Sequence, residues 1–184
     1  MRELAILTFV SLDGVMQAVR LPEEDRSGGF AQGGWAAPYW DDVMDQVGQT
    51  AMRDPYDMLL GRKTYELFAS NQDGNPNDGH VYAISSTLLE PIWENSTILN
   101  GDPVEEVARL KEKNGPLLQI HGSWQLIQTL IGAGMIDEFR LFIFPVILGL
   151  GKRLFEGVEG IDHLNLVSSE PTGNGVVMNT YRKE

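Results

Sequence analysis

The sequence predicts a three-layer α/β/α fold around a mixed, mostly parallel sheet. Three observations lead to this prediction. At 184 residues the chain is long enough for one domain with a substantial core. In its first two thirds, apolar β-prone segments alternate with segments of helical periodicity, a pattern typical of parallel crossovers. In its last third, strand-like segments follow one another, which indicates antiparallel additions to the same sheet. We therefore expect a single domain over residues 1–184.

The composition limits the possible partners. The chain has 26 Asp+Glu against 14 Lys+Arg, and its formal net charge is -12. Nucleic acid requires a basic face, so we expect no nucleic-acid partner. No stretch approaches the ~20 apolar residues of a membrane span, and the first residues are too acidic for a signal peptide. We therefore expect no membrane association and a cytoplasmic protein. The sequence has no cysteine, which excludes disulfides and thiolate chemistry.

The predicted strands are short runs rich in apolar and β-prone residues, bounded by turn residues. The first, LAILTFV, is apolar enough to be buried on both faces, and SLDG ends it. A long glycine-rich loop follows it, and a second, polar loop is predicted at residues 70–79. The predicted strands are residues 4–10, 57–61, 80–86, 117–121, 139–148, 164–168 and 176–181.

Helical spacing and capping residues predict four helices. The first begins near Pro38, and its apolar stripe consists of Trp40, Val43, Met44, Val47 and Ala51. The second covers residues 62–68. The third begins with Asp102 as N-cap, Pro103 and Glu105, and ends near residue 113. The fourth follows Gly122-Ser123.

Three predicted strands end in a short turn of Gly, Ser or Thr residues: residues 60–64, 85–87 and 121–124. Carboxyl ends of parallel strands share one edge of the sheet, where ligands bind. At the first and third turns a helix begins, so free N–H groups favour an anion there. Arg62 and Lys63 add positive charge. Hydroxyl groups that could donate to phosphate are those of Thr64, Ser85, Ser86, Thr87 and Ser123.

Each of these features also has a purely structural explanation. The glycines can serve tight turns, Ser123 can be an N-cap, and an Arg-Lys pair is often a solvated helix face. No G-x-G-x-x-G follows the first strand and no G-K-[ST] occurs, so the sequence has neither common nucleotide signature. Spacing alone therefore predicts an anion-binding α/β protein.

A set of motifs in order along the chain resembles a known family. The matching segments are SLDGVMQ, GGFAQGGWAAPYWDD, LLGRKTYELF, ISSTL and IHGSWQLIQTLIGAGMIDEFRLFIFPVILGLGKRLF. They resemble dihydrofolate-reductase-fold proteins related to the C-terminal reductase domain of the riboflavin-biosynthesis deaminase–reductase (RibD C-terminal domain-like). The resemblance implies a sheet of about eight strands, a homodimer and an NADPH site. It assigns the cofactor to Asp13, Gly14, Gly61, Arg62, Lys63, Thr64, Ser85, Ser86, Thr87, Gly122, Ser123 and Trp124.

The implied activity is an NADPH-dependent hydride transfer to a small heterocyclic substrate. That substrate is pterin- or folate-like, or ribosylaminopyrimidine-like, as for a 5-amino-6-(5-phosphoribosylamino)uracil reductase. Two alternatives stay open: a catalytically inactive nucleotide-binding protein of the same fold, and a true dihydrofolate reductase. We expect no bound metal, because His80, His121 and His163 lack ligand spacing.

Reduction of an imine also needs a proton donor. Asp41 is our first candidate, because on a helix it would lie at the edge of the apolar stripe, where partial desolvation raises a carboxyl pKa. Asp13 is the second. The structural alternatives are helix-dipole compensation for Asp41 and turn formation for Asp13. For substrate contacts we expect the aromatic residues Trp35, Tyr39 and Trp40, whose alternative is core packing.

Overall fold

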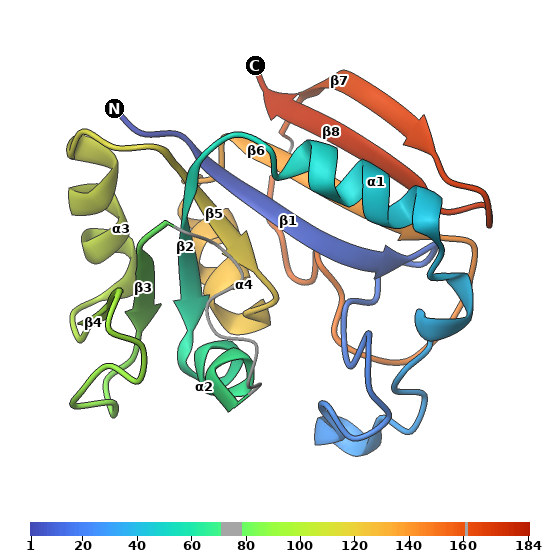
Figure 1. Cartoon of the computed structure of the whole chain (residues 1–184), viewed down its shortest axis with the longest axis horizontal. Coiled ribbons are helices and arrows are strands. Elements are labelled where there is room, and N and C mark those ends of the chain that lie inside the picture. Colours follow the sequence, from blue (N-terminus) through green and yellow to red (C-terminus); the bar gives the residue numbers. More distant parts are fainter. Residues whose placement is uncertain (71–78, 161) are drawn as a thin grey trace. The chain divides into compact units, whose positions relative to one another are not determined.

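Eight strands form a sheet in the order β4-β3-β2-β5-β1-β6-β8-β7 (Figure 1). The structure is a computed structural model that describes residues 1–70, 79–160 and 162–184. The predicted α/β class and the mixed sheet of eight strands are confirmed. The strands are β1 (Leu4–Ser11), β2 (Tyr56–Gly61), β3 (Val81–Ile84), β4 (Ser96–Leu99), β5 (Leu117–His121), β6 (Glu138–Phe144), β7 (Leu164–Pro171) and β8 (Val177–Lys183).

Four α-helices accompany the strands in the described part of the chain, as predicted. They are α1 (Asp42–Ala51), α2 (Arg62–Ser70), α3 (Pro103–Glu112) and α4 (Trp124–Gly132). Most of the loop predicted at residues 70–79, namely residues 71–78, lies outside the described residues.

The chain packs as two compact units, each built from separate stretches of sequence. The first unit comprises Met1–Ile6 and Asp54–Glu138, and the second comprises Leu7–Arg53 and Phe139–Glu184. Strand β1 contributes its start to the first unit and its end to the second. The single domain over residues 1–184 stays a prediction.

In the first unit, β2, β3, β4 and β5 are parallel neighbours. Strand β2 is buried up to its last residue, as its apolar sequence predicts for an inner strand of a parallel sheet. Helix α3 begins as predicted, because Asp102 accepts from the N–H groups of Val104 (2.9 Å) and Glu105 (3.1 Å). The sequence prediction missed β4, which has only four residues and lies at the edge of the sheet.

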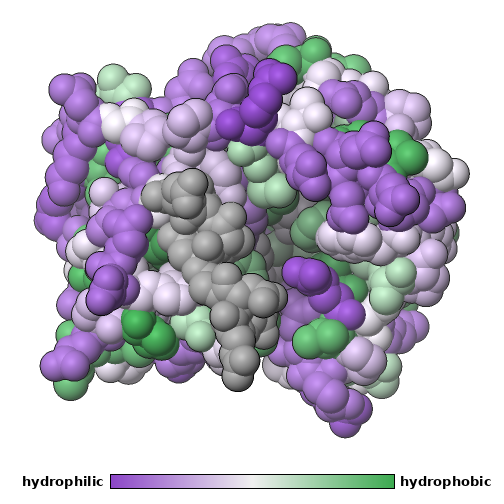
Figure 2. All heavy atoms as spheres, viewed as in Figure 1, coloured by the Kyte–Doolittle hydropathy of each residue, from purple (hydrophilic) through white to green (hydrophobic). Residues whose placement is uncertain are grey.

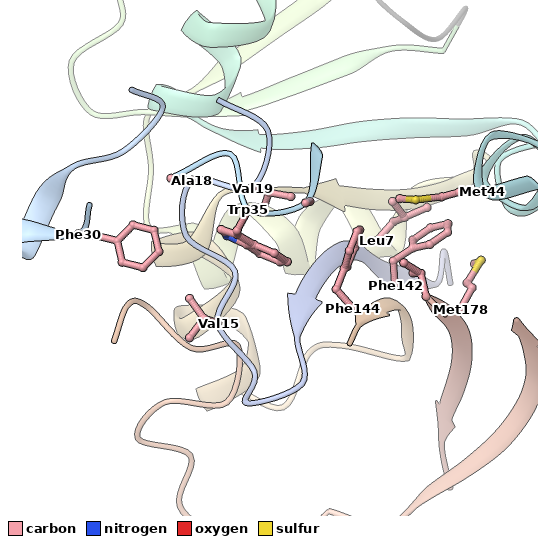
Figure 3. Packing of buried hydrophobic residues seen from close by; sticks show 12 residues of the cluster. Leu7, Val15, Ala18, Val19, Phe30, Trp35, Met44, Phe142, Phe144 and Met178 are labelled. Atoms are coloured by element: carbon pink, nitrogen blue, oxygen red, sulfur yellow. The ribbon is translucent and has the colours of Figure 1, made fainter. Parts of the chain in front are cut away.

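The second unit has its own apolar cluster, in which aromatic rings meet edge to face (Figure 3). Trp35 and Tyr39 both contact Phe144 in this way, with centroid distances of 5.3 Å and 5.9 Å. Helix α1 contributes the buried side chain of Met44 to the cluster. The antiparallel pair β7–β8 belongs to the same unit, and its register shifts between Leu166 and Ser168.

Three predicted boundaries in the second unit were wrong, and one of them is the end of β7, which was predicted at residue 168 but lies at Pro171. The helix predicted from Pro38 begins at Asp42, because Ala37–Tyr39 form a separate 3₁₀ turn and Trp40 is extended. The strand predicted over residues 139–148 ends at Phe144. The next residue is Pro145, which has no N–H to donate to a neighbouring strand.

The visible face in Figure 2 is mostly hydrophilic, with small separate hydrophobic areas, as the excess of acidic residues leads one to expect. Within the described residues, no helix has the length and apolar character needed to cross a bilayer.

Candidate functional site

The first turn of the candidate site joins β2 to α2 without a connecting loop. Gly61 ends the strand, and Arg62 and Lys63 are the first residues of the helix. The first N–H groups of a helix have no acceptor within it, so this end can attract an anion. Lys63 is exposed, whereas Arg62 forms an ion pair with Glu66 at 3.0 Å. Both partners of that pair are about 40% exposed, so the pair is weak and an anion could compete for Arg62.

The second turn, between β5 and α4, contains two successive residues with positive φ. Gly122 has φ +52° and Ser123 has φ +57°. A Cβ on Gly122 would lie 3.2 Å from Cγ2 of Thr64, so both the backbone and the close approach favour glycine there. For Ser123 the left-handed conformation is a strain of about 1 kcal/mol or more that the surrounding bonds must offset.

Those bonds connect the two turns to each other. The N–H of Gly61 donates to Oγ of Ser123 at 2.9 Å, and the N–H of Ser123 donates to Oγ1 of Thr64 at 3.0 Å. The Ser123 hydroxyl itself donates to the carbonyl oxygen of His121 at 3.0 Å. The Ser123 hydroxyl proton is therefore used within the turn, and the expectation that Ser123 Oγ donates to a phosphate stays a prediction. Thr64 Oγ1 serves here as an acceptor, which leaves its own proton for another partner.

The third turn, at the end of β3, differs from the other two. Ser85 is buried, and its Oγ accepts from the N–H groups of Thr87 (3.1 Å) and Leu88 (2.9 Å). Its hydroxyl therefore shapes the turn, as Ser side chains commonly do. Ser86 and Thr87 are exposed, and no helix begins in residues 85–95, all of which the structure describes.

The strand register brings the three turns together. Gly61 is paired with Ile84, and Leu59 is paired with Ile120. Neighbouring parallel strands advance by the same length per residue. Continuing the register therefore places Gly61 level with Gly122 at the end of β5. On the β3 side, Ser85 is the residue after the partner of Gly61. The three turns thus form one carboxyl edge of the first unit, as the sequence predicted.

The other predicted residues lie in the second unit. Asp13 accepts hydrogen bonds from Oγ of Ser11 (2.7 Å) and from the N–H groups of Leu148 (3.1 Å) and Gly149 (2.8 Å). The hydrogen bond from Ser11 lowers the pKa of Asp13 most; burial opposes it, and the two backbone bonds lower the pKa further, to about 2. A carboxyl group with that pKa is ionised at neutral pH, so Asp13 is a poor proton donor. Gly14 has φ +83°, as the predicted turn requires.

Asp41 is not part of the helix. Its backbone is extended, and its carboxylate caps α1 by accepting from the N–H of Met44 at 2.7 Å. The argument that helical geometry places Asp41 at the edge of an apolar stripe was therefore wrong. Its catalytic role stays a prediction without that support.

The three aromatic residues have different surroundings. Trp35 is buried in the apolar cluster, and its Nε1 donates to the carbonyl oxygen of Gln17 at 2.8 Å. Tyr39 packs against the same cluster. Core packing therefore explains both residues without a substrate. Trp40 is 37% exposed and stays available for a ligand.

The sequence reasoning overlooked partners that change how two predicted residues act. Glu66 forms an ion pair with Arg62, and the i, i+4 spacing of the two residues on a predicted helix was enough to predict that pair. Arg153 donates to the carbonyl oxygen of Asp13 at 3.1 Å and to that of Gly149 at 2.7 Å. Nothing local predicts that bond, because Asp13 and Arg153 lie 140 residues apart.

Among the described residues, no group of three or more His, Asp or Glu side chains could hold a metal ion.

The sheet order and the shared carboxyl edge define a dihydrofolate-reductase-like α/β protein. A dihydrofolate reductase from Enterococcus faecalis, complexed with NADP(H) and RAB-propyl, has the same fold, with TM-score 0.67 and 17% identity over 99% of this chain and 96% of the other. The family description "RibD C-terminal domain" matches residues 2–178, and the chain belongs to that family.

The chain is also similar to two uncharacterized proteins and to a further solved structure. "Uncharacterized protein YyaP" of Bacillus subtilis (strain 168) is 32% identical over 166 residues, which cover 83% of this chain and 88% of the relative. "Uncharacterized protein YwjB" of the same strain is 28% identical over 148 residues, covering 78% and 85%. A putative riboflavin biosynthesis protein from Shewanella sp. PV-4 has TM-score 0.78 and 23% identity over 100% of this chain and 99% of the other. The chain therefore has a reductase-type fold.

Proposed function

We propose that this protein is an NADPH-dependent reductase of a small heterocyclic substrate, and that the carboxyl edge of the first unit holds the phosphates of the cofactor. The observation that supports this most is the pair of hydrogen bonds between Gly61, Ser123 and Thr64. They hold two strand–turn–helix junctions in register, so that two helix N-termini act on one ligand.

The residues at this edge fit a dinucleotide. Gly61 and Gly122 let the two turns approach each other closely, and Lys63 and Arg62 supply positive charge in a protein of net charge -12. Ser86 and Thr87 are exposed at the adjacent turn, where their hydroxyl groups can donate to a further phosphate. NADPH, when bound, supplies the hydride. In this proposal the first unit orients the cofactor. We also propose that Trp40, which is 37% exposed, contacts the substrate.

Titration with NADPH and NADH tests the proposal. Arg62→Ala should weaken NADPH binding by about 1–3 kcal/mol if Arg62 makes a charged phosphate contact. NADH should be affected much less if that contact is to the 2′-phosphate. Arg109→Ala is a matched control, because Arg109 pairs with Glu105 at the same i, i+4 spacing on α3. Equal weak binding of both cofactors, unaffected by Arg62→Ala, would refute the cofactor assignment.

A second candidate is a nucleotide-binding protein of this fold without turnover. The two residues predicted as proton donors favour this candidate, because Asp13 is ionised and the carboxylate of Asp41 caps a helix. Steady oxidation of NADPH with dihydrofolate or an aminopyrimidine substrate would exclude this candidate. The same assay, comparing the two substrates, separates a true dihydrofolate reductase from a ribosylaminopyrimidine reductase.

We also propose that the chain forms a homodimer, as the family resemblance implies. The edge strand β7 has two exposed apolar side chains, those of Leu166 and Val167. An interface with a second copy of the chain at this strand would cover them. Sedimentation velocity should give about twice the chain mass of 20.5 kDa. A monomer at tens of micromolar protein would contradict the proposal.

A further inference from the structure

Arg20 is an exposed arginine of the second unit whose guanidinium lies over the ring of Trp40. Its Cζ is 5.4 Å from the ring centroid. A cation–π contact of this kind uses the positive charge but none of the five N–H donors of the guanidinium. Those donors stay available for hydrogen bonds.

Other arginines of the protein are already paired with a carboxylate, among them Arg2, Arg26, Arg62, Arg109 and Arg153. For the Arg20 side chain, the contact with the ring of Trp40 is the only hydrogen bond, ion pair or ring contact found within residues 1–70, 79–160 and 162–184. The nearby Glu24 carboxylate is bonded instead to the backbone N–H groups of Arg20 (2.9 Å) and Leu21 (3.2 Å). In a chain with 26 acidic residues, a guanidinium without an acidic partner is well placed to receive an anion from outside.

The ring beneath Arg20 is held in place from two sides. Nε1 of Trp40 donates to Oδ1 of Asp45 at 2.7 Å, and the ring meets Phe9 at a centroid distance of 5.5 Å. Phe9 in turn packs on Phe142 in the apolar cluster, at 5.2 Å. Trp40 is thus the partly exposed end of a row of packed rings, and it fixes where the guanidinium stands.

We infer that Arg20 is a specificity-determining residue for the substrate, and that it selects a planar heterocycle carrying an oxyanion over a neutral one. This inference rests on the proposed function, in which Trp40 contacts the substrate. It also refines the part played by Trp40: the indole ring positions Arg20, and the planar N–H fork of Arg20 recognises a carboxylate or a phosphate.

Matched pairs of probes test the inference by calorimetric titration without NADPH. Pterin-6-carboxylate is compared with pterin, and uridine 5′-monophosphate with uridine. Wild-type protein should bind the anionic member of one pair about tenfold to hundredfold tighter than its neutral counterpart, the usual range for a charged hydrogen bond. The pair that shows the difference identifies the oxyanion as carboxylate or phosphate.

Four variants test the inference and give it its controls. Arg20→Ala should reduce the affinity for the anionic probe to that for the neutral one, and Arg20→Lys should restore only part of it, because lysine lacks the fork. Arg53→Ala, which removes another exposed arginine of the same unit, should change nothing. Arg62→Ala should also leave probe binding unchanged, which excludes binding at the cofactor edge.

Several results would overturn the inference. These are equal affinity for both members of each pair, an effect of Arg53→Ala as large as that of Arg20→Ala, and no binding of any probe at millimolar concentration. The reductase proposal fails separately: a protein that shows Arg20-dependent selection but binds no NADPH would refute the cofactor assignment and leave the role of Arg20 intact.

Discussion

The N–H of Ser123 donates to Oγ1 of Thr64 at 3.0 Å, and this bond joins the start of α4 to the first turn of α2. It connects residues that lie 59 positions apart in the sequence. The two helix N-termini therefore keep a defined separation at one edge of the first unit, and the first two predictions follow from that bond.

Thr64→Val removes the acceptor of this bond while keeping the β-branched shape. The N–H of Ser123 is then left without its partner, so we expect a loss of about 1–2 kcal/mol in the free energy of unfolding and weaker binding of NADPH. Thr64→Ser should retain most of both properties. Thr129→Val is the control, because the Thr129 hydroxyl donates within α4, to the carbonyl oxygen of Gln125. Urea denaturation and cofactor titration measure the two effects, and equal results for the two valine variants would contradict this role of Thr64.

Ser123 combines a positive φ with a structural hydroxyl, and two substitutions separate these features. Ser123→Ala and Ser123→Gly both remove the hydroxyl, but glycine also relieves the left-handed strain. We expect Ser123→Gly to be more stable than Ser123→Ala by about 1 kcal/mol. Thermal or urea unfolding of the two variants gives the comparison. If alanine is as stable as glycine or more stable, the left-handed strain does not govern stability at this position.

Arg2 and Asp57 form a buried ion pair in the first unit, and Asp57 also accepts from the N–H of His80 at 2.9 Å. Asp57→Ala leaves the Arg2 guanidinium buried without its counter-charge. We therefore expect a loss of about 3–5 kcal/mol in the free energy of unfolding.

Glu105→Ala is the contrasting variant, because it breaks an exposed pair with Arg109 and should cost less than about 1 kcal/mol. The double variant Arg2→Met/Asp57→Ala should recover part of the loss. No recovery would show that Asp57 acts mainly through His80.

The depressed pKa of Asp13 makes a pH-dependent contribution to stability. Its pKa falls from 3.8 to about 2 in the folded protein, so the folded state binds the proton less tightly than the unfolded state. The contribution is complete above about pH 4 and is lost as the pH falls towards 2. We expect Asp13→Asn to be less stable than wild type by about 1 kcal/mol at pH 7, below the full linkage value because solvent screens the group. Urea unfolding at pH 7 and at pH 2.5 should show this difference shrinking; a difference that stays constant would contradict it.

Asp41→Asn separates capping from catalysis at one position. Asparagine caps helices about as well as aspartate, so the free energy of unfolding should change by less than about 0.5 kcal/mol. If Asp41 also donates the proton, NADPH oxidation should fall by about 10²-fold or more while cofactor binding is retained. Unchanged turnover in a stable variant would assign Asp41 to capping alone.

The sequence by itself determined the α/β class, the alternation of strands and helices in the first unit, and the three turns that end β2, β3 and β5. These are local properties: apolar runs, caps such as Asp102, and Gly-Ser-Thr turns have the same meaning wherever the chain folds. The carboxyl edge followed from them, because the carboxyl ends of parallel strands lie along the same edge of a sheet.

Only the tertiary structure decided what the polar side chains do. Asp13 became a loop anchor because the backbone N–H groups of Leu148 and Gly149 reach its carboxylate, and Trp35 became a core residue because it packs edge to face with Phe144. Arg20 gained its position from Trp40, and Ser123 gained its strained backbone together with the bonds to Gly61 and Thr64 that stabilise it. Each of these roles depends on a hydrogen bond or ring contact between residues that are distant in sequence, and such contacts exist only after the chain has folded.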